Sequence, residues 1–199
     1  MSTAVQNRRA PSWVSAHKTR NFMLKDPLLD WLDLYGENEG FVRDDRQEGY
    51  DPETDFGRFI RAKGMAFEDG IVELLSARFN IVRMKHNRAG DVVQQAAETL
   101  ALMKRGVEVI AQGCVADDAS KTLGYPDLLM RADVFSKLWP DAPMPDALLR
   151  PTPNAGRVGY VVVDIKFTTL RLLAGGNLGN SGSAPAYKAQ LFICSRALA

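Results

Sequence analysis

The sequence predicts an α/β fold in which a small central mixed β-sheet is flanked by helices. Apolar residues recur at helical spacing over 56–79 and 91–105, and short apolar runs bounded by turn-forming residues occur at 107–115, 127–135 and 157–167. Helical and strand-like segments in this order are typical of a sheet covered by helices. With 199 residues, of which 46% are hydrophobic, the chain is long enough for one sizeable core.

Composition and charge exclude several classes of protein. No apolar run approaches the roughly 18 residues of a membrane span. The N-terminus has no signal-peptide pattern and two cysteines do not make a disulfide framework, so we expect a protein of the reducing cytoplasm with no membrane partner. Charge is uneven, because residues 1–25 hold five basic residues and no acid, whereas 26–56 hold eleven acids and two arginines. A polyanion would therefore find local positive surface although the net charge is only +1.

Residues 1–55 are expected to form an N-terminal helical segment and an acidic connector. Two short helices are predicted within 15–36, the second capped by Asp26 with Pro27 in its first turn. Residues 37–55 are polar and acidic without periodicity, which predicts a surface loop. The residues expected to anchor the second helix are apolar: Leu28, Leu29, Trp31 and Leu32.

Residues 56–199 are expected to form the core. The first helix, 56–79, is predicted to face the core along its length, and the second ends before Gly106. The run 107–115 is predicted to be a strand, followed by a polar turn and a second strand, 127–135, so that the two form a hairpin.

The C-terminal part is predicted to add a third strand and a helix. Residues 136–157 hold five prolines, which predicts an irregular insertion before the strand at 157–167. The Gly- and Ser-rich residues 174–185 predict a flexible connector. The helix expected at 186–199 meets the chain end, which leaves open whether the chain is complete or part of a longer protein or complex.

A set of acids and one lysine follows these predicted elements. Asp164 and Lys166, at i and i+2, point to one face where a buried strand ends. Asp127 begins the preceding strand and Glu68 lies in the long helix. Two like charges about 5 Å apart repel by roughly 3 kcal/mol at an effective dielectric of about 20, and one lysine cannot neutralise three acids. A divalent cation that takes oxygen ligands can neutralise them, and such a metal site suits phosphodiester hydrolysis.

The order of these residues resembles the PD-(D/E)XK nuclease superfamily, and especially its RecB-like branch. The similar segments are GMAFEDGI (64–71), GYPDLLMR (124–131), YVVVDIKF (160–167) and AYKAQLFIC (186–194). The resemblance implies a restriction-endonuclease-like core and a nuclease that uses Mg²⁺ or Mn²⁺ and acts on DNA; single- and double-stranded DNA are both compatible with these residues. It also implies the following roles: Glu68, Asp127 and Asp164 as metal-binding acids, the Ile165 carbonyl as a further ligand, and Lys166 as the catalytic lysine.

The fourth segment departs from the pattern of the branch. Gln190 is similar to the glutamine of the QxxxY motif, which implies contact with DNA near the site, but Cys194 stands where the tyrosine is expected. Tyr187, one helical turn before Gln190, is the candidate substitute. Some relatives carry an iron–sulfur cluster on four cysteines; two cysteines cannot ligate one in this chain, so none is expected.

Other interpretations stay open from the sequence alone. Lys166 can form a structural ion pair with Asp164, Asp127 can be a turn residue after proline, and Glu68 can be solvated. His17 is interpreted as a surface residue or one near a phosphate. At the level of function, the alternatives are a catalytically inactive nucleic-acid-binding module on the same fold, or a scaffold domain that docks through its acidic segment.

Overall fold

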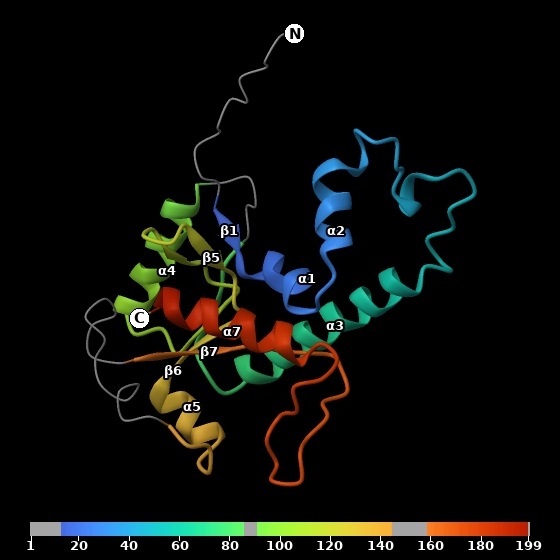
Figure 1. Ribbon diagram of the computed structural model, residues 1–199. Helices are drawn as coiled ribbons and strands as arrows, with labels where there is room; N and C mark the ends of the chain where they lie inside the picture. Colours follow the sequence, from blue (N-terminus) through green and yellow to red (C-terminus); the bar gives the residue numbers. More distant parts are fainter. Residues whose placement is uncertain (1–12, 86–90, 145–158, 199) are drawn as a thin grey trace.

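Figure 1 shows the computed structural model, which describes residues 13–85, 91–144 and 159–198. Within these residues the protein is mixed α/β with two small mixed sheets. The strands are β1 (Val14–Ser15), β2 (Ile81–Arg83), β3 (Val109–Ala111), β4 (Val115–Asp117), β5 (Thr122–Gly124), β6 (Leu128–Arg131) and β7 (Tyr160–Val163). The helices are α1 (Arg20–Met23), α2 (Pro27–Trp31), α3 (Phe56–Ser76), α4 (Val92–Lys104), α5 (Ala132–Leu138) and α7 (Ala184–Leu198), with short 3₁₀ or π turns η1 (Ala16–Thr19), η2 (Leu32–Gly36) and η3 (Asp44–Arg46).

The larger sheet has the strand order β2-β3-β6-β7 and carries the core. Strands β2 and β3 are parallel, whereas β6 is antiparallel to both β3 and β7. The smaller sheet has the order β1-β5-β4, in which β4 and β5 form a hairpin. Helix α7 contacts both β4 and β5 of the small sheet and β7 of the large one, and it crosses in front of the large sheet in Figure 1. This helix therefore joins the two sheets.

Alternate residues of the central strands enter two hydrophobic clusters, as the two-residue period of a strand requires. Ile110 and Leu129 pack on one side with residues of α4 and α7, whereas Val109, Leu128 and Met130 pack on the other with residues of α3 and α5. The large sheet is thus covered on both faces, which explains why its strands read as continuous apolar runs.

Helix α3 faces the core only near its C-terminal end, so the expectation of a core-facing helix throughout 56–79 is wrong. Val72 and Leu75 are 8% exposed, whereas Phe56 is 72% exposed and Phe59 52%. A helix of 21 residues is about 31 Å long, and the four residues of β7 span only about 13 Å. Most of α3 therefore extends beyond the sheet, as Figure 1 shows.

Two predicted strands have different ends in the structure. The run 107–115 is divided between β3 and β4, because Gln112 adopts a left-handed conformation (φ +56°) that ends the first strand. The run 127–135 forms β6 and then turns into α5 at Ala132, so its second half is helical. Short buried apolar runs fit a strand or a helix equally well by periodicity. The predicted antiparallel pairing of the two runs is confirmed for β3 and β6, but the two do not form a simple hairpin, because β4 and β5 lie between them in the chain.

The N-terminal helix and strand β2 differ from the predictions in detail. Helix α2 begins at Pro27, but the Asp26 side chain makes no capping hydrogen bond. Leu28, Leu29 and Trp31 are exposed and do not anchor α2. Strand β2, not predicted, lies in a segment whose basic residues mask its apolar ones.

Several expectations reach the limits of the described residues. Residues 145–158, most of the expected insertion, lie outside them, and 174–183 form neither helix nor strand apart from one isolated bridge, Leu172 to Leu178. No helix in the described ranges combines the length and the apolar character that a membrane crossing would require.

Candidate active site

The pairing of β6 with β7 places two carboxylates side by side. Leu128 is opposite Val163 in this antiparallel pair, so Asp127, just before β6, and Asp164, just after β7, lie at the same edge of the sheet. The backbone N–H of Ile165 donates to Oδ2 of Asp127 at 2.6 Å. This bond fixes the Asp127 carboxylate against the chain that leaves β7.

Lys166 contacts both carboxylates. Its Nζ lies 2.7 Å from Oδ1 of Asp164 and 3.8 Å from Oδ2 of Asp127. Asp164 and Lys166 therefore share a face, as their spacing predicts. The side chains are 5% exposed for Asp164, 18% for Asp127 and 25% for Lys166. The lysine is thus the member of the group most accessible to a ligand.

The electrostatic state of the pair reflects its burial. Burial raises the pKa of the Asp127 carboxyl to about 7, and the hydrogen bond and negative charge of Asp164 act in the same direction against the opposing charge of Lys166. Oδ2 of Asp164 is buried and has no hydrogen-bond partner within the described residues. A buried carboxylate oxygen without a partner is costly, so this atom is available to bind a cation or a proton.

Glu68 is not brought into this pair. Its Oε1 accepts a hydrogen bond of 2.8 Å from Nε2 of Gln112, and the backbone N–H of Gln112 donates to the carbonyl oxygen of Asp127 at 2.9 Å. Glu68 is therefore connected to Asp127 through Gln112, a residue that the sequence did not single out. The signal that marks Gln112 is its place at the end of an apolar run, directly before Gly113.

A cavity of about 320 Å³ opens beside the pair. Asp127 and Lys166 line it together with Tyr187 and Gln190 from α7. The Tyr187 ring lies 5.5 Å from Nζ of Lys166, close enough for a cation–π interaction. The two α7 residues predicted to contact substrate thus line the same cavity as Asp127 and Lys166.

The N-terminal segment also contributes to the wall of this cavity. His17 of η1 and Arg20 of α1 line it, because both elements pack against α7. Arg20 was not predicted to be part of a site. The sequence feature that could have indicated Arg20 is the composition of residues 1–25, which contain basic residues and no acid. The wall of the cavity therefore includes the Asp127 carboxylate and the Arg20 guanidinium group, a combination that suits a ligand carrying both a cation and a phosphate.

Cys194 belongs to the core and not to the cavity. It is 1% exposed, and a Cβ atom on Gly124 would collide with its Sγ. A tyrosine side chain would not fit in this space, which explains why Tyr187 is the aromatic residue near Lys166. Burial raises the pKa of the Cys114 thiol to about 11 and that of Cys194 to about 12, so neither is a nucleophilic thiolate at neutral pH.

The residues present suit one hard cation held by two carboxylates. A cation between the two carboxylates would give Oδ2 of Asp164 a partner. It would also lower the pKa of Asp127, which burial and the neighbouring acid raise. In the described part of the chain, no group of three His, Cys, Asp or Glu residues is close enough to hold a metal ion. The expected third ligand, Glu68, is therefore not in place, and the Ile165 carbonyl stays a prediction.

No family model matches this chain, and neither a curated protein nor a solved structure does.

Proposed function

We propose that this chain is a metal-dependent nuclease that hydrolyses phosphodiester bonds, with DNA as its substrate and a restriction-endonuclease-like core as its fold. One observation supports it above all: Asp127 and Asp164 meet at the ends of two antiparallel strands. Lys166 contacts both carboxylates, and Asp127 and Lys166 line a cavity. A buried pair of acids is otherwise costly to a fold, and such groups are concentrated at functional sites.

The chain's own residues have separable tasks in this proposal. Asp127 and Asp164 would hold Mg²⁺ or Mn²⁺, which when bound supplies charge neutralisation and makes water more acidic. Lys166 presents its ammonium group to the cavity, where it stabilises negative charge on the phosphate and orients the attacking water. Arg20 faces the same space and offers a second positive charge to a phosphate oxygen. Tyr187 and Gln190 line the same cavity, where they would contact the DNA strand.

Glu68 has a positioning task. Its carboxylate accepts a hydrogen bond from the Gln112 side chain, and the backbone N–H of the same Gln112 donates to the carbonyl oxygen of Asp127. Removing the carboxylate would loosen the turn that places Asp127. Glu68→Gln, which keeps an acceptor, is expected to retain more activity than Glu68→Ala.

A cleavage assay on linear, circular and single-stranded DNA with Mg²⁺ or Mn²⁺ tests the proposal. Asp164→Asn and Lys166→Ala are each expected to lower the rate by at least about 100-fold, because each removes a charge that acts on the reacting phosphate. Asp141→Asn and Lys104→Ala are matched controls at exposed positions and should cut at the unaltered rate. Metal-dependent cutting that persists in both site variants would refute this site.

The alternative function is a nucleic-acid-binding module without catalysis. The separation of Glu68 from the carboxylate pair favours it, because the described residues then offer only two acids to a cation. This alternative predicts DNA binding with no cutting and no measurable heat of metal binding.

A further inference from the structure

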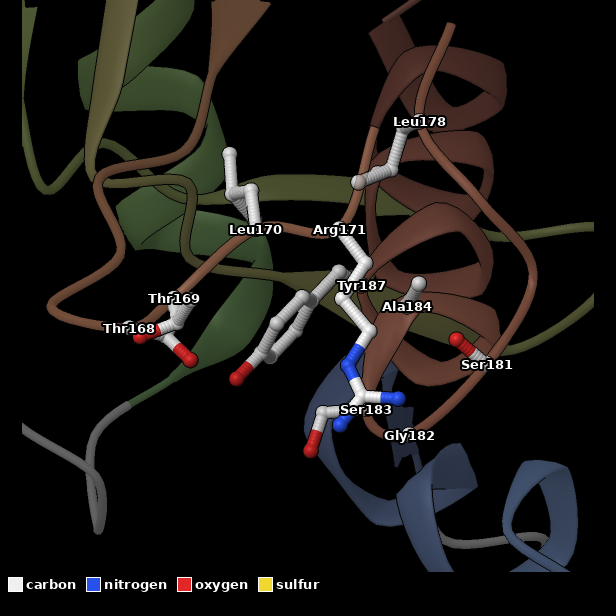
Figure 2. A pocket seen from close by; sticks show the side chains of 10 residues that line it. All are labelled: Thr168, Thr169, Leu170, Arg171, Leu178, Ser181, Gly182, Ser183, Ala184 and Tyr187. Atoms are coloured by element: carbon white, nitrogen blue, oxygen red, sulfur yellow. The ribbon is translucent and has the colours of Figure 1, made fainter. Parts of the chain in front are cut away.

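A second, smaller pocket lies beside the first. Its volume is about 80 Å³, and Thr168, Arg171, Ser181 and Ser183 contribute polar side chains to its wall. Tyr187 lines both pockets, so the two share one residue of their walls. Figure 2 shows the polar ends of Arg171, Tyr187 and Ser183 directed toward the same opening. The second pocket therefore adjoins the candidate active site at Tyr187.

The lining of this pocket is positive and has no acid. Hydroxyl groups and one guanidinium group provide its polar atoms, and no Asp or Glu is among the residues that form it. The Arg171 side chain has no hydrogen bond or ion pair with any of the described residues. An unpaired guanidinium group among hydroxyl donors is suited to an oxyanion, because arginine presents several N–H groups in a planar fork.

The size of the pocket restricts the anion. A water molecule takes about 30 Å³ of liquid, so the space corresponds to roughly two or three waters. That space is suitable for a small group such as a single phosphate. The larger pocket, about 320 Å³, has room for more of a nucleotide.

We propose that the Arg171 pocket binds a phosphate group of the nucleic-acid strand whose neighbouring phosphate is cleaved in the cavity lined by Asp127 and Lys166. This inference rests on the proposed function, since it takes nucleic acid to be the ligand of the larger cavity. The strand passes over Tyr187, and Arg171 fixes which phosphate lies beside Lys166. Arg171 thus determines the position of cleavage relative to a bound phosphate.

The test uses binding of a fluorescein-labelled single-stranded DNA oligonucleotide, measured by anisotropy without divalent metal at several salt concentrations. Arg171→Ala is expected to weaken binding several-fold and to reduce the slope of log K against log salt by about 1, because one phosphate contact is lost. Arg171→Lys should retain most of the slope. Arg105→Ala, an exposed arginine at the end of α4, should leave both quantities unchanged.

Oligonucleotides with one neutral methylphosphonate linkage identify the phosphate. The unaltered protein should lose affinity at one linkage, and Arg171→Ala should show no further loss there. If the effect of Arg171→Ala requires a 5′- or 3′-terminal phosphate instead, the proposal holds with an end group as the source of the anion. Arg171→Gln repeats the test if the alanine variant does not fold.

An unchanged salt slope in Arg171→Ala would overturn the phosphate site even if the protein cuts DNA. Loss of the slope in a protein that never cuts DNA would keep the phosphate site and refute the nuclease. The two failures are therefore distinguishable.

Discussion

The large sheet and the N-terminal arm, residues 26–63, both contain large apolar side chains but place them in opposite surroundings. Residues of β3 and β6 such as Ile110 and Leu129 are completely buried, whereas Leu28 and Phe56 in the arm are 60% and 72% exposed. Aromatic residues of the arm contact mainly each other, as in the edge-on packing of Trp31 and Phe41. The difference shows that an apolar pattern becomes a core only where a second layer covers it.

Helix α3 contains both situations in one element. Its N-terminal turns belong to the arm and its C-terminal turns pack on the sheet, where Val72 and Leu75 are buried. The free energy of folding should therefore come from the sheet and its covering helices. The carboxylate pair lies in that region, which is rigid enough to keep two acids together.

The largest expected effect on stability is in the sheet. Leu129→Ala removes a fully buried side chain between β3 and β7 and should lower the free energy of unfolding by about 2–5 kcal/mol. Leu28→Ala removes an exposed one and should change it by less than about 0.5 kcal/mol. Urea unfolding followed by circular dichroism measures both. Equal losses in the two variants would show that the arm is part of the core.

The same glycine-to-alanine change should have opposite signs in the two settings. At Gly124 the new methyl group collides with the buried Cys194 Sγ, so Gly124→Ala should destabilise the protein by about 1–3 kcal/mol. At Gly70, in the exposed part of α3, nothing lies within 4 Å, and Gly70→Ala should stabilise it by up to about 1 kcal/mol. Thermal unfolding of the two variants decides the point, and a shift of the same sign in both would contradict this description of the packing.

The carboxylate pair should make the stability of the metal-free protein depend on pH. The pKa of Asp127 is about 7 in the folded protein and about 3.9 in an unfolded chain, so the folded state binds the proton more tightly. Protonated Asp127 therefore adds to the free energy of unfolding. This addition is complete below about pH 4 and is lost as the pH rises toward 7, by at most about 1.4 kcal/mol per pH unit. Unfolding in the presence of a chelator, compared between the unaltered protein and Asp127→Asn, isolates this effect. A difference between the two that does not vary from pH 4 to 7 would contradict the raised pKa.

The sequence predicted the parts of the site that depend on local geometry. Asp164 and Lys166 share a face because they are two residues apart, and Asp127 meets them through a predictable antiparallel pairing. It did not predict Gln112 or Arg20, since their positions depend on where a strand breaks and on how α1 packs on α7. The exposure of the arm was missed for a related reason: periodicity shows that a helix has an apolar face, not whether another element covers it.

Mn²⁺ binding, measured by isothermal titration calorimetry on the full chain, tests most directly whether Asp127 and Asp164 together form a cation site. The unaltered protein should bind Mn²⁺ with an affinity that rises with pH through about 7, as Asp127 loses its proton. Asp164→Asn should abolish that binding, and Asp141→Asn should leave it intact. Binding of Mn²⁺ that is unchanged in both Asp127→Asn and Asp164→Asn would contradict the account.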